Sequence, residues 1–376
     1  MRILRVAQKV YPDVKGGGPY HVHAMSRDQA AMGHDVTVVT VRQDDSLPHV
    51  EGRDGYTVVR YDPAVNLLGN DISPGIAQYL ADAKDFDVMH AHSHLYFSTN
   101  LAALKRFLGD IPLAITNHGL YSQNAPEWVF DLYLRSLGRW TFDQADVVFC
   151  YTETDKERVR EFGVSSRIEV VPNGIDTERF SPEGPESDLV DADGPVVLFV
   201  GRLVEGKRPR DAIAALERVR GECPEATLYF CGDGPLRSDL EDEVIRRGLE
   251  DAIEFVGHVP YEDVPTIYRS ADVLVLPSRA EGLPRTVLES MASATPVVVS
   301  DLPQVAPIAT EGGEAVSVGA VDEFANEIGR LIRDRHTRRE LGEHGRDVVG
   351  STHDWQDTVD RTTAALTELP TGTSKK

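Results

Sequence analysis

The sequence predicts an α/β protein made of two Rossmann-like domains, each a doubly wound parallel sheet. Short strands rich in valine and isoleucine alternate with helical patterns along the chain, which is typical of parallel sheets covered by helices. The same alternation occurs once in each half of the sequence. In addition, 376 residues are more than one ordinary core organises. Two domains of similar architecture are therefore expected.

Six apolar segments of the first half are predicted to be strands, with helical patterns such as 21–32 and 71–83 between them. They are Ile3–Ala7, Asp35–Val41, Tyr56–Tyr61, Val88–Ala91, Leu113–Thr116 and Val147–Cys150. The second half repeats the arrangement, with predicted strands at Val196–Val200, Thr227–Cys231, Ile253–Val256, Val273–Leu276, Val297–Ser300 and Ala315–Val318. Parallel sheets bind ligands beyond the carboxyl ends of their strands, so the loops that follow these strands are the candidate functional segments.

A stretch rich in proline, glycine and aspartate between Pro172 and Gly194 has no secondary-structure period and separates the two halves. We therefore expect an N-terminal domain over residues 1–172 and a C-terminal domain over 173–353. The last helical pattern covers 354–370, and the tail 371–376 is expected to be disordered.

The composition is strongly acidic, with a net charge of −22. Such a chain is not expected to bind nucleic acid, whose phosphates repel it. Arginine outnumbers lysine roughly fourfold and aspartate exceeds glutamate, which resembles the cytoplasmic proteins of salt-loving archaea and predicts a halophilic host. No apolar run approaches the roughly 18 residues of a membrane helix. The three cysteines are spaced like reduced, buried residues, so the predicted location is cytoplasmic.

The segment from Glu281 to Glu289 holds two carboxylates eight positions apart, after a predicted strand. Gly282 and Pro284 shape the loop, and a helix is expected to begin near Leu283. The free amides and the positive dipole at such a helix start suit a diphosphate. The two carboxylates can accept hydrogen bonds from sugar or ribose hydroxyls.

With Ser290-Met-Ala and Pro296 in register behind it, this segment resembles the donor-binding signature of glycosyltransferase family 4. The resemblance implies the GT-B fold, in which two Rossmann-like domains face each other across a cleft and the C-terminal helix crosses back to the first domain. It implies a retaining enzyme whose C-terminal domain binds a nucleotide diphosphate sugar as co-substrate and whose N-terminal domain binds the acceptor. No further cofactor and no metal are expected. The implied donor-site residues here are Glu281 for the sugar, Glu289 for the ribose, and Gly282, Leu283 and Pro284 beside them.

Two basic residues, Arg202 and Lys207, follow the predicted strand Val196–Val200 on one loop. Fixed cations beside a departing nucleoside diphosphate stabilise the transition state more than the ground state, so the pair is interpreted as catalytic rather than as solvated surface charge. The loop resembles the family's G-R-L…K pattern. The family usually has Lys-Gly, whereas here Gly206 precedes Lys207, so Arg208 could share the lysine's task.

Gly16, Gly17 and Gly18 lie between the first strand and the first helix. Glycines permit a close approach of the main chain to a ligand, and the helix N-terminus that follows favours an anion. They do not have the spacing of the dinucleotide-binding fingerprint. Their position resembles the family's glycine-rich segment, which approaches the donor diphosphate; a flexible turn is the alternative.

His118 follows the predicted strand Leu113–Thr116. A single histidine on a loop is usually structural. The family has a histidine-glycine pair here, which implies that His118 positions the transferred sugar and stabilises positive charge on its ring. The group that stabilises this charge could be the backbone carbonyl of His118. His90 and His92 are interpreted as packing and cleft-lining residues, because we expect their side chains to face opposite sides of the strand and so not to share a metal.

Gly232 and the pair His258–Val259 follow two further strands of the second half. By resemblance these turns flank the nucleobase, which main-chain groups near His258 would contact. Asp233 is either part of this site or a turn and helix-capping residue.

The aromatic and basic segment 127–142 could touch a lipid-linked acceptor or make weak contact with the inner face of the cell membrane. Its apolar residues also recur at helical spacing, which favours ordinary packing. The sequence as a whole predicts a hexosyltransferase with a glycan or lipid-linked acceptor. The alternatives are a sugar-nucleotide epimerase, a phosphorylase, or a non-catalytic scaffold of the same fold.

Overall fold

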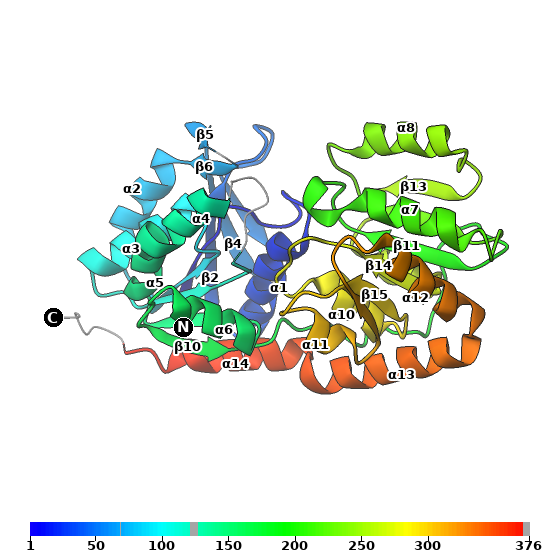
Figure 1. Cartoon of the computed structure of the whole chain (residues 1–376). Coiled ribbons are helices and arrows are strands. Elements are labelled where there is room, and N and C mark those ends of the chain that lie inside the picture. Colours follow the sequence, from blue (N-terminus) through cyan, green and yellow to red (C-terminus); the bar gives the residue numbers. More distant parts are fainter. Residues whose placement is uncertain (68, 121–126, 371–376) are drawn as a thin grey trace. The chain divides into compact units, whose positions relative to one another are not determined.

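The computed structural model describes residues 1–67, 69–120 and 127–370, and Figure 1 shows the whole chain. The chain divides into two compact units. Unit 1 comprises Met1–Pro172 and the chain from Asp357 onward, and unit 2 comprises Asn173–Gln356. The first boundary therefore coincides with the expected one, whereas the return to unit 1 comes three residues later than the expected 354. The predicted disorder of 371–376 lies outside the described residues.

Among the described residues of unit 1, eight strands form one sheet in the order β10-β9-β8-β7-β1-β2-β4-β3. Neighbouring strands are parallel, except that β3 and β4 are antiparallel. The strands are β1 (Arg2–Val6), β2 (Asp35–Val41), β3 (Val50–Arg53), β4 (Tyr56–Tyr61), β7 (Val88–His92), β8 (Leu113–Thr116), β9 (Val147–Cys150) and β10 (Arg167–Val170). A small antiparallel hairpin, β5 (Val65–Leu67) and β6 (Asn70–Ile72), lies outside this sheet.

Helices cover both faces of this sheet, and its central strands β1 and β7 are buried on both sides. The helices of unit 1 are α1 (Gly17–Ala31), α2 (Pro74–Asp82), α3 (Phe97–Leu108), α4 (Glu127–Tyr133), the π-helical turn η1 (Leu134–Gly138), α5 (Arg139–Gln144), α6 (Glu153–Glu161) and α14 (Trp355–Thr367). One face packs against α2, α3, α5 and α6, and the other against α1 and α14.

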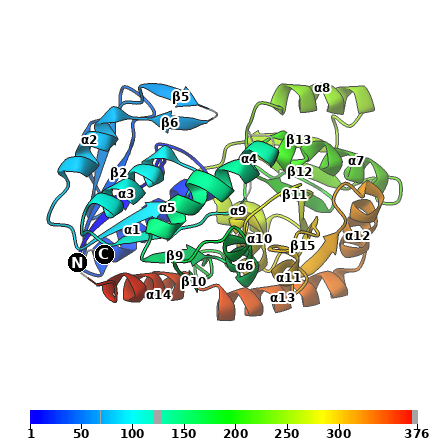
Figure 2. The same ribbon diagram turned by 60° about the vertical axis from the view of Figure 1, so that its left-hand side comes forward.

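The C-terminal helix α14 packs on unit 1, as the family resemblance implied. Its Ala365 and Leu366 join the apolar core under α1, and Thr363 accepts a buried 2.9 Å hydrogen bond from Gln29. The helix runs beside β10, as Figures 1 and 2 both show, and Arg361 donates to the Val170 carbonyl at 2.6 Å.

In the described part of unit 2, six parallel strands form a sheet in the order β13-β12-β11-β14-β15-β16. They are β11 (Val196–Val200), β12 (Thr227–Cys231), β13 (Ile253–Gly257), β14 (Val273–Leu276), β15 (Val297–Ser300) and β16 (Gly313–Val316). The helices are the 3-10 turn η2 (Glu205–Lys207), α7 (Pro209–Val219), α8 (Arg237–Arg247), α9 (Val264–Arg269), α10 (Arg285–Ala292), α11 (Ala306–Ala309), α12 (Val321–Arg333) and α13 (Arg335–Thr352). One apolar core of this unit joins α7, α8 and α12 to the sheet, and α7 and α12 lie side by side in Figure 1.

The twelve predicted strands are all present, with bounds within two residues of those expected. The prediction missed β3, β5, β6 and β10, and it placed Asp71 in a helix although this residue belongs to β6. The three cysteines are free and buried, as expected. In the residues that the structure describes, no helix combines the length and the hydrophobicity needed to cross a membrane.

Candidate active site

Three loops of unit 2 stack on one another at the carboxyl ends of β11, β12 and β13. The Gly201 amide donates to the Cys231 carbonyl at 3.0 Å, and the Gly232 amide donates to the Gly257 carbonyl at 2.7 Å. Gly232 has φ 146°, and a Cβ at this position would lie 2.0 Å from the Gly201 carbonyl oxygen. Only glycine fits such an approach, so Gly232 is required by the loop packing itself.

Lys207 and Glu281, predicted separately from two motifs, meet in a direct ion pair. The ammonium of Lys207, at the end of η2, lies 2.5 Å from Oε1 of Glu281, in the loop after β14. Their side chains are only 13% and 5% exposed. The main chain joins the same two loops, since the Arg279 amide donates to the Gly206 carbonyl at 2.8 Å. The buried amide of Gln304 binds the Glu281 carbonyl, so the acid is fixed through its main chain as well.

The two arginines of the loop after β11, Arg202 and Arg208, have different surroundings. Arg202 is exposed, and its guanidinium forms no hydrogen bond or ion pair with residues in the described ranges. Arg208 adopts the left-handed conformation, with φ 51°, and its guanidinium binds Asp211 at 2.7 Å. Arg208 is thus paired with Asp211, and a share in the task of Lys207 stays a prediction.

Helix α10 begins at Arg285, two residues after the expected start, with Pro284 as its N-cap. Proline offers no side chain that caps the helix, and none is present. The amides of Arg285 and Thr286, at the positive end of the dipole, therefore have no side-chain cap, whereas the Val287 amide donates to the Pro284 carbonyl at 3.2 Å. This helix end follows the Glu281–Pro284 loop directly, which places it beside the lysine-glutamate pair along the chain.

Glu289, in the second turn of α10, is buried, and its side-chain oxygens are bound by residues from other segments. The hydroxyls of Tyr261 and Tyr268 donate to its two oxygens at 3.0 and 3.1 Å, and Nε of Arg285 lies 3.5 Å from it. Arg285 also donates to the Gly174 carbonyl at 3.0 Å. Tyr261 and Tyr268 come from segments outside the motif, and no local pattern identifies them.

The buried thiol of Cys231 lies at the end of β12. Burial is the main cause that raises the pKa of the Cys231 thiol to about 12, and the charge of Glu289 adds to it, while a hydrogen bond with the main chain of Val259 opposes the shift. The hydrogen bond places the predicted position Val259 next to Cys231. The neighbouring His258 is exposed.

In unit 1, the glycine-rich segment starts helix α1. Gly16 is the N-cap with φ 132°, a conformation that favours glycine, and Gly17 is the first helical residue. A Cβ on Gly18 would meet no atom within 4 Å, so the loop surface is open there. The chain just before this segment is fixed by Asp13, whose carboxylate binds Arg60 at 2.6 Å and Arg53 at 2.9 Å.

His118 has both ring nitrogens engaged. The hydroxyl of Tyr151 lies 2.8 Å from Nδ1, and Nδ1 of His92 lies 3.1 Å from Nε2. Burial lowers the pKa of His118 to about 4. The ring of His21, from α1, packs against His118 with centroids 5.4 Å apart. The first helix after the glycine-rich segment thus touches His118.

The expectation that His90 and His92 face opposite sides of their strand was wrong. Alternate residues of a strand share a face, and the two ring centroids lie 4.4 Å apart. Both side chains are buried, which agrees with a packing role. His90 binds Thr116 Oγ1 through Nε2 at 2.8 Å, so it belongs to the hydrogen-bonded interior of the sheet.

Comparison with known proteins matches both halves of the chain to glycosyltransferase families. Residues 15–179 match the family described as Glycosyltransferase Family 4, and residues 181–348 match Glycosyl transferases group 1. The glycogen synthase of Mycobacterium tuberculosis is 30% identical over 97% of this chain and 94% of its own length. The chain belongs to glycosyltransferase family 4. A GDP-mannose:cellobiosyl-diphosphopolyprenol alpha-mannosyltransferase of Xanthomonas oryzae is 24% identical over 96% of this chain and 95% of its own.

Solved structures agree on the fold of this glycosyltransferase. Sucrose-phosphate synthase from Thermosynechococcus elongatus aligns with a TM-score of 0.82 at 22% identity, covering 98% of this chain and 99% of its own. Anabaena HepE in complex with UDP-glucose aligns with a TM-score of 0.79 at 19% identity, covering 98% and 100%. These likenesses establish the GT-B fold expected from the sequence.

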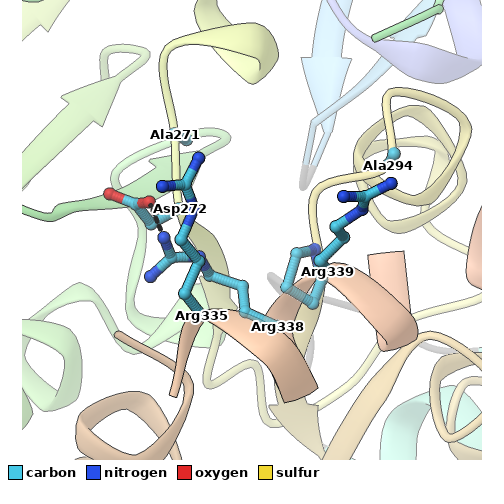
Figure 3. A pocket seen from close by; sticks show the side chains of 7 residues that line it. Ala271, Asp272, Ala294, Arg335, Arg338 and Arg339 are labelled. Atoms are coloured by element: carbon cyan, nitrogen blue, oxygen red, sulfur yellow. Dashed lines mark ion pairs between the residues drawn. The ribbon is translucent and has the colours of Figure 1, made fainter. Parts of the chain in front are cut away.

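A hollow of about 220 Å³ lies elsewhere in unit 2 (Figure 3). It is lined by Ala271, Asp272, Ala294, Pro296, Arg335, Arg338 and Arg339, and Arg338 forms an ion pair with Asp272 at 3.0 Å. Asp272 and Pro296 immediately precede β14 and β15, so the hollow lies at the amino ends of these strands. Ligands of parallel sheets bind at the opposite edge, and none of the predicted site residues lines this hollow.

Proposed function

We propose that this glycosyltransferase moves a hexose, with retention of anomeric configuration, from a nucleoside diphosphate sugar to a glycan or lipid-linked acceptor. The observation that supports this most is the buried pair of Lys207 and Glu281 at the carboxyl edge of the unit 2 sheet. A fixed cation beside a fixed acid suits a ligand that combines a diphosphate with sugar hydroxyls. The uncapped start of α10 adds an anion-binding group in the same stretch of chain.

In the proposed mechanism, Lys207 and the exposed Arg202 bind the diphosphate together with the first amides of α10. The bond between the anomeric carbon and the phosphate oxygen breaks while a bond to the acceptor oxygen forms on the same face of the sugar. The proton of the acceptor hydroxyl passes to the departing phosphate oxygen. Charge on the leaving group grows during this step, so the two cations stabilise the transition state more than the bound donor. No metal is assigned a role.

The remaining predicted residues are assigned to recognition. Glu281 accepts hydrogen bonds from sugar hydroxyls, and Glu289 accepts them from the ribose with the oxygen lone pairs that its tyrosine partners leave free. Main-chain groups at His258 and Val259 contact the base. Gly16 to Gly18 approach the diphosphate, and His118 stabilises positive charge on the sugar ring.

The nature of the donor is proposed from relatives. HepE was solved with UDP-glucose, and the Xanthomonas relative is named for GDP-mannose. We therefore propose a UDP- or GDP-hexose, with ADP-hexoses as the next class to test.

The proposal of a lipid-linked acceptor has support from exposed apolar side chains on unit 1. Trp128 and Leu132 on α4 are 72% and 63% exposed, and Phe107 and Leu108 on α3 are also exposed. Exposed tryptophan and leucine on a helix suit the boundary between lipid headgroups and acyl chains. Other members of the segment are packed, since Phe142 is buried. Weak contact with the cytoplasmic face of a membrane is therefore part of the proposal.

The test is a thermal-shift and turnover screen of UDP-, GDP- and ADP-hexoses in concentrated KCl, with and without EDTA. We expect one nucleotide class to raise the melting temperature and to be turned over in EDTA, and the product anomer, read by NMR, to match the donor. An inverted product refutes retention. Conversion of the donor to an epimer without transfer identifies a sugar-nucleotide epimerase, and failure of every nucleotide sugar to shift the melting temperature identifies a non-catalytic protein of the same fold.

A further inference from the structure

We propose that Tyr151 and His92 are positioning residues that hold the side chain of His118 as the neutral tautomer with its proton on Nε2. This inference rests on the proposed function, because it concerns the residue assigned to the transferred sugar. Neither Tyr151 nor His92 was predicted to act in the reaction.

The geometry consists of three side chains in a row. Tyr151, directly after β9, is buried and places its hydroxyl 2.8 Å from Nδ1 of His118. On the other side, Nε2 of His118 lies 3.1 Å from Nδ1 of His92, the last residue of β7. Because the two contacts use different ring nitrogens, they fix both the position and the rotation of the imidazole.

The chemistry of the partners decides where the proton resides. A phenol is a far stronger acid than a neutral imidazole N–H, so the Tyr151 hydroxyl donates and Nδ1 of His118 accepts. The proton of His118 must then reside on Nε2, which donates to Nδ1 of His92. It follows that His92 bears its own proton on Nε2, a buried atom with no hydrogen-bond partner among the residues that the structure describes.

Burial favours the neutral form of His118, and positive or titratable groups lie around its partners. His21 from α1 packs on His118 and on Tyr151, and Arg5 from β1 lies 3.4 Å from His90, whose ring adjoins His92. Burial lowers the pKa of His118 to about 4, and burial with nearby positive groups holds the pKa of His92 well below its usual range.

A neutral His118 has a direct consequence for catalysis. Positive charge develops on the sugar ring in the transition state of glycosyl transfer, and an imidazolium beside it would raise the barrier. Both ring nitrogens are occupied by protein groups, so in the proposed arrangement the sugar is contacted by the main-chain carbonyl of His118. Tyr151 and His92 therefore act through His118 and not on the substrate.

The first test needs no substrate. In protein labelled with ¹⁵N-histidine, His118 of the wild type should show an unprotonated Nδ1 and a protonated Nε2 from pH 5 to 8. Tyr151→Phe should convert His118 to a mixture of tautomers and raise its pKa toward the ordinary value, because Nδ1 loses its donor. A wild-type His118 protonated on Nδ1, or a tautomer unchanged in Tyr151→Phe, overturns the proposal. This result is independent of whether any donor is turned over.

The second test is kinetic and uses the nucleotide hexose that supports turnover. Tyr151→Phe should lower kcat on the order of tenfold to a hundredfold, leave the donor KM within about twofold, and move the acid limb of kcat to higher pH. His92→Asn keeps an acceptor oxygen near the position of Nδ1 and should retain most of the activity, whereas His92→Leu should lose it. Equal kcat values for His92→Asn and His92→Leu, or an unchanged kcat in Tyr151→Phe, refute the positioning role.

Tyr56→Phe is the matched control. Tyr56 is buried in the same unit and forms the same kind of bond, with its hydroxyl 3.0 Å from Nδ1 of His23. This variant should lose a similar hydrogen bond and keep the wild-type kcat and acid limb. A fall in kcat equal to that of Tyr151→Phe would show that the loss of any buried tyrosine–histidine hydrogen bond lowers kcat. That result would overturn the positioning role assigned to Tyr151 at His118.

Discussion

The pair of Lys207 and Glu281 allows its structural and catalytic contributions to be separated by a double-mutant cycle. Lys207→Met removes the ammonium while keeping an unbranched side chain of similar length. The variant leaves Glu281 as a buried carboxylate without its cation, since that side chain is only 5% exposed. Lys207→Met combined with Glu281→Gln removes both charges and leaves an amide that can still form hydrogen bonds.

The expected magnitude follows from the burial of the pair. Loss of one partner of a buried ion pair costs about 3–5 kcal/mol. Coulomb's law gives a similar size, because two unit charges 4 Å apart attract by about 4 kcal/mol at an effective dielectric constant of 20. Lys207→Met should therefore lower the free energy of unfolding by about 3 kcal/mol. The double variant should recover most of this loss, because no uncompensated charge remains.

Urea unfolding and turnover measured on the same preparations provide the assay. Both variants should lose about 10²- to 10³-fold in turnover, since each lacks the cation that the proposed mechanism places at the leaving group. Arg106→Met is the matched control, because Arg106 and Asp146 form a 2.8 Å pair with side chains 4% and 8% exposed and no predicted site residue takes part. This control should lose stability and keep its turnover. The catalytic part of the reasoning is refuted if the double variant recovers turnover as well as stability. The structural part is refuted if Lys207→Met is as stable as the wild type.

Four further predictions follow from individual contacts. Gly232→Ala should prevent normal folding of unit 2, because the new Cβ would lie 2.0 Å from the Gly201 carbonyl oxygen, whereas Gly18→Ala should unfold thermally like the wild type. Glu289→Gln should raise the donor KM about tenfold, because an amide oxygen accepts weaker bonds than a carboxylate; a fall in kcat at constant KM contradicts the ribose assignment. Molar KCl should raise the melting temperature by screening the net charge of −22, and an unchanged melting temperature argues against a halophilic host. Burial alone would raise the pKa of Asp13, yet hydrogen bonds from Arg60 and Arg53 outweigh it and hold the pKa below its usual value. The free energy of unfolding that these bonds contribute should therefore be lost as the pH falls below about 4. In urea titrations at several pH values, the free energy of unfolding of Asp13→Asn should fall less steeply in acid than that of the wild type.

The parallel strands were predictable because they are buried on both faces. Val273–Leu276 is a continuous apolar run, and β15 begins with three valines, which is typical of strands buried on both faces. The four missed strands are short, and two of them are mostly polar. The edge strand β3 is Val-Glu-Gly-Arg, and β6 is Asn-Asp-Ile in a hairpin outside the main sheets, so neither has an apolar face that would identify it.

The loops of the candidate site were predictable because each motif is local. Glycines, a helix start and charged residues within ten positions of one another leave a pattern that can be recognised in one segment. The partners of these residues could not be predicted. Tyr261 lies in the turn before α9 and Tyr268 lies in α9, and both bind Glu289. Gln304 lies in the segment after β15 and binds Glu281. Such contacts depend on how the elements pack, which no short-range pattern encodes.

The surroundings of the two motif carboxylates support different roles for them. Glu281 is compensated by the ammonium of Lys207, so an arriving diphosphate would share that cation and leave Glu281 free to accept bonds from the sugar beside it. Glu289 is instead held by two neutral tyrosine hydroxyls, with Arg285 at 3.5 Å, and its position is fixed before any ligand binds. A carboxylate that is already oriented suits a part of the donor that does not change during the reaction, such as the ribose. A carboxylate coupled to the leaving-group cation suits the part that does change, and this is why the cycle at Lys207 and Glu281 tests the mechanism more directly than any substitution of Glu289.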